Sequence, residues 1–199
     1  MILLADCEGG ETDIVFILDA SGSIGDRNFD IMRDFVASII RELDVDNGRL
    51  RVGLMTFSNF PTEQFYLNTY SNRNAMLIAV DNIRYTRGTT NTAAALEFAR
   101  QTMFTVFRGD RIGVPDMVVI ITDGESNDGP ETLIQAKLAK EEGIHIISVG
   151  VGNWIDRYEL EIMASHPFEI NMIHVDSFDA LSTIVYVLRD ALCDSKYWL

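Results

Sequence analysis

The sequence predicts an α/β fold: a doubly wound, mostly parallel, six-stranded sheet with helices on both faces. The first observation is that short apolar, β-branched runs alternate with longer segments of helical periodicity. The second is that two of these runs end abruptly in polar residues, as buried parallel strands do at a ligand-binding edge. Strands are expected at 13–18, 51–57, 62–67, 117–122, 144–151 and 171–175. Strands that alternate with helices form βαβ units and hence a parallel sheet.

The helical segments follow from the spacing of their apolar residues. Segment 26–43 places Phe29, Met32, Phe35, Ile39 and Leu43 at steps of three and four, which gives one apolar face. Further helices are expected at 73–83, 91–104, 130–142, 156–164 and 177–192. Gly143 supplies a stop for the fourth of these six helices.

The strands differ in how much polar character they carry. Segment 13–18 is almost wholly apolar, which indicates a central strand covered on both faces. Segment 62–67 has polar positions and follows the turn at 58–61, so it is expected to pair back as an edge strand.

Composition limits the class of protein. A chain of 199 residues with 47% hydrophobic residues fits one packed domain. The net charge of −14, from 30 acidic and 16 basic residues, disfavours nucleic acid and anionic membranes as partners. No apolar run approaches the length of a membrane helix, and the opening residues 1–4 are too short for a signal-peptide core.

The most informative stretch is the end of the first strand. Asp19, Ser21 and Ser23 place three oxygen side chains at alternate positions, with Gly22 allowing the chain to curl. Such a set suits a hard divalent cation. The alternative is a strand end followed by an Asp/Ser turn and a helix cap.

Two further segments favour the metal interpretation. The strand at 117–122 ends in Asp123-Gly124, and the polar loop at 87–92 carries Thr90 just before a helix. Ligands of open α/β sheets bind at the carboxyl ends of strands, where the strand order reverses. If the strands ending at Asp19 and Asp123 are neighbours there, the two carboxylates share one crevice.

These residues together resemble the von Willebrand factor type A domain, as found in integrin α chains, matrilins and non-fibrillar collagens. Asp19, Ser21, Ser23, Thr90 and Asp123 match the five positions of that family's metal-ion-dependent adhesion site, in order and in context. The resemblance implies one antiparallel edge strand and a bound Mg²⁺, Mn²⁺ or Ca²⁺. It also implies a protein ligand that offers a Glu or Asp side chain to the metal. The expected organisation is a tail at 1–12, the domain at 13–193 and a tail at 194–199.

The sequence does not predict an enzyme, and no residue is assigned a catalytic role. His145, His166 and His174 lack metal-ligand spacing, and two of them lie in or beside apolar strands. The chain also has no Gly-x-x-x-x-Gly-Lys-Ser/Thr loop for nucleotide phosphates.

The two cysteines lie at opposite ends of the expected domain. The placement of Cys7 and Cys193 resembles the terminal disulfide of some type A domains, which favours a secreted, extracellular-matrix location. The alternative is a pair of free thiols in a cytosolic protein.

Two smaller sets of residues are candidate contact points. Glu125, Trp154 and Tyr158 are expected near the metal and form a candidate ligand rim. The alternative is an exposed turn carboxylate for Glu125 and a cap on the core for the two aromatic residues. The tripeptide at 108–110, Arg108-Gly109-Asp110, is a candidate integrin-recognition sequence on an exposed turn. The alternative is an ordinary Gly-Asp turn.

The sequence therefore predicts an extracellular adhesion or matrix-assembly module that binds a protein ligand through a divalent cation. Collagen is the first ligand that membership of this family suggests. The alternative function is a structural matrix domain with metal-independent contacts and weak calcium or mineral association.

Overall fold

The computed structural model describes residues 10–193, and they form one six-stranded sheet flanked by helices. The strand order is β3-β2-β1-β4-β5-β6. All neighbouring strands are parallel except β2 and β3, which pair antiparallel at one edge. The strands are β1 (Thr12–Asp19), β2 (Leu50–Phe57), β3 (Pro61–Phe65), β4 (Asp116–Thr122), β5 (His145–Val151) and β6 (Met172–Val175). The predicted fold class is confirmed, including the antiparallel edge strand.

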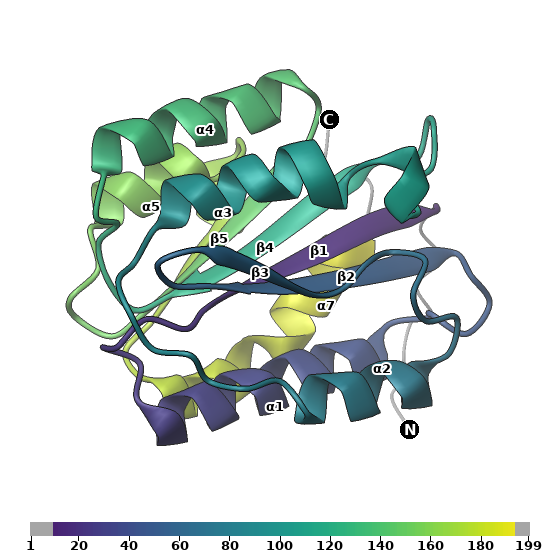
Figure 1. The fold of residues 1–199 in the computed structure, drawn as a ribbon, viewed down its shortest axis with the longest axis horizontal. Helices are drawn as coiled ribbons and strands as arrows, with labels where there is room; N and C mark the ends of the chain where they lie inside the picture. The colour runs from purple at the N-terminus through teal and green to yellow at the C-terminus, as the bar shows by residue number, and fades with distance from the viewer. Residues whose placement is uncertain (1–9, 194–199) are drawn as a thin grey trace.

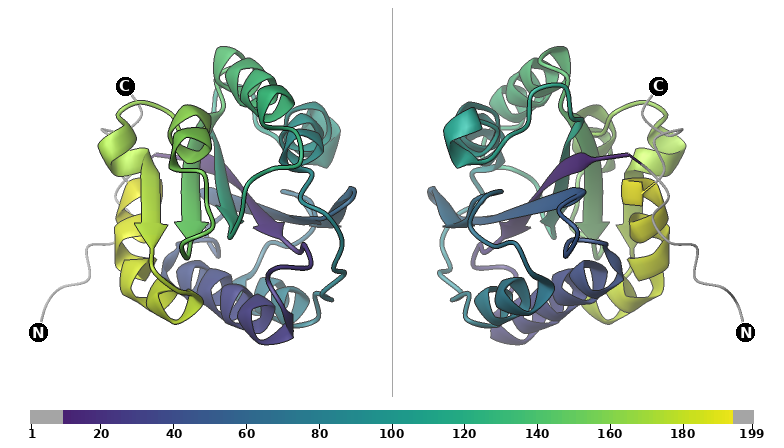
Figure 2. Two further views of the ribbon diagram at one scale, coloured as in Figure 1. Left: turned by 90° about the vertical axis from the view of Figure 1, so that its left-hand side faces the viewer. Right: turned by 90° about the vertical axis from the view of Figure 1, so that its right-hand side faces the viewer.

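The helices form a layer on each face of the sheet (Figures 1 and 2). One layer holds α1 (Asp26–Glu42), α2 (Arg73–Asp81) and α7 (Val185–Cys193). The other holds α3 (Thr92–Phe98), α4 (Gly129–Glu141) and α5 (Arg157–Met163). The short helix α6 (Phe168–Asn171) leads into β6.

Strand β1 contributes to the hydrophobic core on both sides of the sheet. Ile14, Phe16 and Leu18 pack in the cluster under α1, α2 and α7, whereas Val15 and Ile17 pack in the cluster under α3, α4 and α5. Because side chains alternate between the faces of a strand, a run without polar residues is buried on both. Each such side chain contributes about 1.5–3 kcal/mol on burial. Polar chemistry on β1 is therefore confined to its two ends.

Two of the expected helices are less regular than the sequence suggested. Segment 91–104 is α3 followed by a π-helical turn at Ala99–Met103, and the wider turn buries both Ala99 and Met103. Segment 177–192 begins as a 3₁₀ helix at Phe178–Ile184 before α7. Phe178 and Leu181 are buried there at a spacing of three, which matches three residues per turn.

The ends of the domain are only partly described. Cys193 is the last residue of α7, while Cys7 lies outside the described residues. The Cys7–Cys193 bridge and the two tails therefore remain predictions. Within residues 10–193, no helix has both the length and the apolar character needed to cross a membrane.

Candidate metal centre

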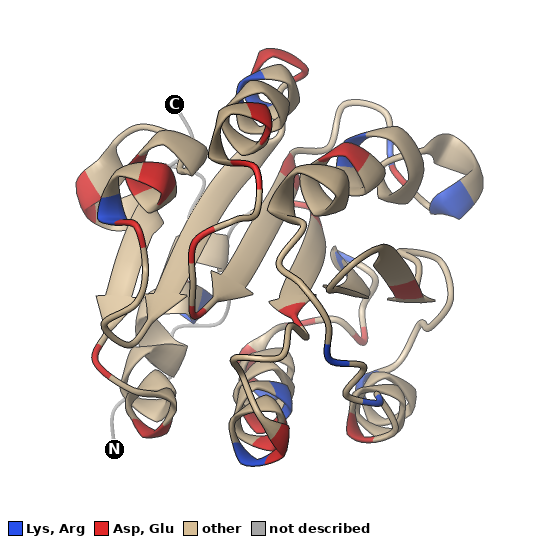
Figure 3. Ribbon diagram, turned by 60° about the vertical axis from the view of Figure 1, so that its left-hand side comes forward, with Lys and Arg blue, Asp and Glu red and all other residues tan. Residues whose placement is uncertain are grey.

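The candidate centre lies where the strand order reverses. β1 pairs with β2 on one side and with β4 on the other, so the crossover connections leave in opposite directions from this point. Leu18 pairs with Ile121, which brings the carboxyl ends of β1 and β4 to the same edge. Figure 3 shows acidic residues on the strand tips and on loops at this edge. The predicted neighbourhood of the two strand ends is therefore correct.

A chain of short polar contacts joins four of the five predicted ligands. The carboxylate of Asp19 accepts a hydrogen bond from the Ser21 backbone N–H at 2.8 Å. The hydroxyl oxygens of Ser21 and Ser23 lie 3.1 Å apart. The Ser23 hydroxyl donates to Asp123 Oδ1 at 2.8 Å. Residues that are distant in the sequence thus converge on one small volume.

The fifth predicted ligand, Thr90, lies on a neighbouring loop. The loop that carries it is held beside the 19–23 turn, because the Gly22 N–H donates to the Gly88 carbonyl at 2.9 Å. Gly88 has φ +123°, and a Cβ there would lie 2.7 Å from Asn59 Oδ1, so only glycine fits without rearrangement. The Thr90 N–H in turn donates to Asn127 Oδ1 at 2.9 Å.

The electrostatics of the centre favour a bound cation. Asp19 has no exposed surface, and its burial raises its pKa to about 6, although hydrogen bonds from Thr122 and Ser21 oppose that shift. Burial also raises the pKa of Asp123, while the Ser23 hydroxyl lowers it. A buried carboxylate is costly unless a cation or hydrogen bonds compensate it. No ion pair within residues 10–193 involves either carboxylate.

The donor set fits the metal implied by the sequence. Carboxylate and hydroxyl oxygens are the ligands that Mg²⁺, Mn²⁺ and Ca²⁺ accept in proteins. Ser21, Ser23 and Thr90 are neutral ligands, and a carboxylate that acts only through bound water would leave part of the charge of a divalent ion uncompensated. Such an ion would stay electrophilic toward a further carboxylate.

Several residues that shape the centre were not anticipated from the sequence. The Thr122 hydroxyl donates to Asp19 Oδ2 at 2.7 Å. Its position next to Asp123 in the sequence is the one local feature that could have indicated this role. The Tyr85 hydroxyl donates to the Ser21 carbonyl at 2.6 Å and accepts from the Gly25 N–H at 2.9 Å. Tyr85 therefore stabilises the turn that holds both serines, and no local motif indicates this role.

The expected rim residues differ in position. Glu125 is exposed on the loop after Asp123, and Trp154, which follows β5, is 88% exposed and does not cap the core. Tyr158 is exposed and lies in the first turn of α5, within the helix expected at 156–164. Phe60, in the turn between β2 and β3, is 76% exposed and was not anticipated. Whether any of these residues contacts a ligand remains a prediction.

The three histidines make ordinary structural contacts. His145 Nε2 lies 2.9 Å from Asn171 Oδ1, and His174 Nε2 lies 2.8 Å from the Gly152 carbonyl. The ring of His166 packs against Phe168.

The tripeptide at 108–110 is exposed only at its first residue. Arg108 lies over the ring of Tyr66, with 4.0 Å between its guanidinium carbon and the ring centroid. Gly109 is buried, and its carbonyl accepts from Arg51 Nη1 at 2.6 Å. Asp110 is half-buried and its carboxylate faces other carboxylates. Arg108 is exposed, whereas Gly109 and Asp110 are covered because the loop packs against the amino ends of the strands; recognition of the tripeptide by an integrin remains a prediction.

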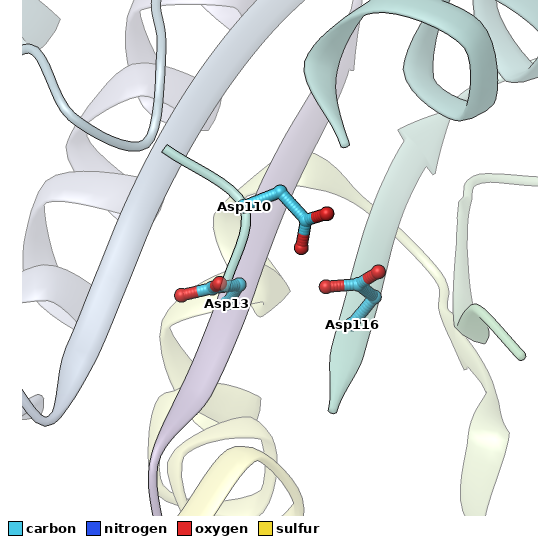
Figure 4. A group of neighbouring side chains, drawn as sticks. All are labelled: Asp13, Asp110 and Asp116. Atoms are coloured by element: carbon cyan, nitrogen blue, oxygen red, sulfur yellow. The ribbon is translucent and has the colours of Figure 1, made fainter. Parts of the chain in front are cut away.

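A second acidic cluster lies at that opposite edge of the sheet, separate from the candidate metal centre. Oxygen atoms of Asp13, Asp110 and Asp116 approach within 4.8 Å of one another (Figure 4). Arg111 Nε donates to Asp13 Oδ1 at 2.9 Å, and this pair neutralises one charge. Burial, together with the neighbouring Asp110 carboxyl, raises the pKa of Asp116 to about 8. The cluster therefore retains a proton at neutral pH.

The fold and the centre together define a class: a doubly wound domain with candidate oxygen ligands for a metal on three loops at the strand-order switch. The family model of the von Willebrand factor type A domain matches residues 13–187. The chain belongs to this family, as the sequence predicted.

Two similar proteins are collagen chains. The collagen alpha-5(VI) chain of Mus musculus is 40% identical over 196 residues, 97% of this chain but 7% of that protein. The collagen alpha-1(XII) chain of Notophthalmus viridescens is 34% identical over 93% of this chain and 20% of its own length. The chain thus spans a small part of these relatives. They are extracellular matrix collagens, in agreement with the predicted location.

A solved structure adds information on the metal. Proximal thread matrix protein 1 from the mussel byssus, with a zinc-occupied metal-ion-dependent adhesion site, superposes with a TM-score of 0.83. It is 30% identical, and the match covers 94% of this chain and 47% of that one. A divalent metal at this site is therefore established for that similar protein.

Proposed function

We propose that this domain is an extracellular adhesion or matrix-assembly module that binds an acidic side chain of a protein ligand through a divalent cation. The observation that carries the proposal is the hydrogen-bonded series Asp19–Ser21–Ser23–Asp123, in which the Asp19 carboxylate is fully buried. The same arrangement serves a bound ion with oxygen ligands and leaves it only partly neutralised.

Each side chain has a distinct part in that function. Ser21 and Ser23 supply neutral direct ligands, and Thr90 supplies a third that binds directly or through water. Asp19 and Asp123 contribute negative charge at the rear of the site, as ligands or as acceptors for bound water. Mg²⁺ or Mn²⁺ is the proposed ion, with Ca²⁺ as the alternative, and its electrophilic position would accept the carboxylate of the ligand.

The exposed side chains around the centre support a protein as the ligand. Trp154 and Tyr158 are large, exposed and follow the carboxyl end of β5. Phe60 is also exposed and follows the carboxyl end of β2. Aromatic residues of this kind are enriched in protein–protein contacts. Fibrillar collagen is the first ligand to test, because the relatives are collagen chains.

The test compares binding to immobilised collagen in Mg²⁺ and in excess EDTA, with Asp123→Ala and the matched control Asp34→Ala. Asp34 is an exposed residue of α1. The proposal predicts that binding disappears in EDTA and in Asp123→Ala but persists in Asp34→Ala. Binding that survives EDTA and Asp123→Ala would instead support the structural matrix domain with metal-independent contacts. Failure to bind Mn²⁺ in calorimetry would remove the metal-bridged function altogether.

A further inference from the structure

The backbone of Thr90 is held by a single residue of the loop between β4 and α4. The Thr90 N–H donates to Asn127 Oδ1 at 2.9 Å, and the Asn127 N–H donates to the Thr90 carbonyl at 2.9 Å. Both main-chain polar groups of Thr90 are thus used by Asn127. What Thr90 retains for other contacts is its side-chain hydroxyl.

The Asn127 loop is itself anchored to α5. The carboxylate of Glu159 accepts from the Ser126 N–H at 3.1 Å and from the Ser126 hydroxyl at 2.6 Å. Glu159 is only 6% exposed, and a Cβ on Gly129 would lie 3.3 Å from its Oε2, so the carboxylate fills a fitted space. Burial raises the pKa of Glu159 and the two Ser126 donors lower it, which shows that these bonds compensate the buried group.

These contacts form one connected path from α5 to the metal centre. It runs from Glu159 to Ser126, then through Asn127 to Thr90, and none of the three residues before Thr90 belongs to the five predicted ligands. Asp123 lies at the start of the same loop, at the carboxyl end of β4. The path therefore holds the loop that carries Thr90 against the loop that begins at Asp123.

We propose that Asn127 is a positioning residue for the metal, which presents the Thr90 hydroxyl to the ion, and that Glu159 secures Asn127 from α5. The inference rests on the proposed metal-dependent function. Without the Asn127 amide, the Thr90 N–H is left to water and the 87–91 loop gains freedom. Metal binding must then order that loop, and the affinity falls accordingly.

The experiment is a double-mutant cycle read by Mn²⁺ calorimetry, using the wild type, Asn127→Ala, Thr90→Ala and the double variant. Each single variant is expected to lose about tenfold in Mn²⁺ affinity. Because Asn127 acts through Thr90, the double variant is expected to bind no more weakly than Thr90→Ala alone. Additive losses, about a hundredfold in the double variant, would overturn the positioning role.

Controls separate this role from general destabilisation. Asn82→Ala deletes an exposed asparagine whose side chain donates to a backbone carbonyl, that of Ile78, and that lies after α2. It should leave the Mn²⁺ affinity unchanged. The melting temperature in EDTA should stay within a few degrees of wild type for Asn127→Ala, since the site is then without metal. A loss of affinity that merely follows a lower melting temperature would refute the inference.

A second pair of variants tests the contribution of Glu159. Glu159→Gln keeps the shape but leaves one oxygen to accept from two Ser126 donors, and a loss of about threefold in Mn²⁺ affinity is expected. Glu161→Gln changes an exposed carboxylate of the same helix and should have no effect. Equal affinities for both variants would exclude Glu159 from the path.

The outcomes for the function and for this inference can be told apart. If the wild type itself binds no Mn²⁺, the proposed function fails. If the wild type binds Mn²⁺ and Asp123→Ala does not, but Asn127→Ala binds like wild type, only this inference fails.

Discussion

Replacing Asp116 by Asn should stabilise the protein as the pH rises. Asp116 and Asp110 face each other at the amino edge of the sheet, with Asp13 beside them (Figure 4). Arg111 is paired with Asp13. Asp116 Oδ1 is buried and has no hydrogen-bond partner among residues 10–193. Burial first, and the Asp110 carboxyl second, raise the pKa of Asp116 from 3.8 to about 8. Asp116 therefore ionises less readily in the folded state than in the unfolded chain.

The sign and size of the effect follow from proton linkage. Between about pH 4 and pH 8 the folded state keeps a proton that the unfolded state has released, so the free energy of unfolding falls as pH rises. One proton corresponds to at most about 1.4 kcal/mol per pH unit. The carboxyl is half-buried and can turn toward water when it ionises, so we expect a loss of about 2 kcal/mol between pH 5 and pH 8. The amide introduced by Asp116→Asn cannot ionise, and it can donate a hydrogen bond to Asp110.

The assay is urea unfolding followed by far-UV circular dichroism at pH 5 and pH 8. The quantity compared is the difference in unfolding free energy between Asp116→Asn and wild type, which cancels the other titrating groups. This difference should grow by about 2 kcal/mol in favour of the variant on going to pH 8. Asp34→Asn, an exposed position on α1, should show no such change. A difference that is equal at both pH values would refute the conclusion that the cluster retains a proton.

Three further predictions concern the metal, the core and the buried ion pair. Mg²⁺ at a hundred times its dissociation constant should stabilise the wild type by about 2.7 kcal/mol, as seen by differential scanning calorimetry, whereas Asp123→Ala should melt at one temperature with or without the ion. Gly150→Ala should lower the free energy of unfolding in urea by about 2 kcal/mol, because a Cβ there collides with Leu160 Cδ1 and lies 2.8 Å from Ile155 Cδ1. An unchanged urea midpoint would contradict this prediction. Arg111→Met should cost about 3 kcal/mol by leaving buried Asp13 without its cation, while Arg27→Met, which breaks the exposed pair with Asp179, should cost little. Equal losses of unfolding free energy in the two variants would contradict the conclusion that burial of the Arg111–Asp13 pair makes it the more important one.

The sequence by itself determined the sheet and the positions of the principal candidate ligands, because both follow from local patterns. The apolar run of β1 requires burial on two faces, and its abrupt end places Asp19, Ser21 and Ser23 at the edge where ligands bind. Periodicity likewise located most helices. It did not reveal the π turn at Ala99–Met103 or the 3₁₀ start at Phe178, since helix type there depends on which side chains the core accepts.

Only the tertiary structure decided what surrounds those ligands. Tyr85, Asn127 and Glu159 shape or anchor the centre through contacts between loops that are distant in sequence. The local sequence around each of them carries no sign of these partners, because the partners meet only when the sheet and both helical layers are assembled.

The burial of Gly109 and the partial burial of Asp110 in the tripeptide at 108–110 were also decided only by tertiary contacts, although the three residues match a recognition motif in the sequence. Its environment is decided by the packing of Gly109 and by the carboxyls of Asp13 and Asp116. These two carboxyls belong to neighbouring strands, and the pairing of β1 with β4 brings both of them to Asp110.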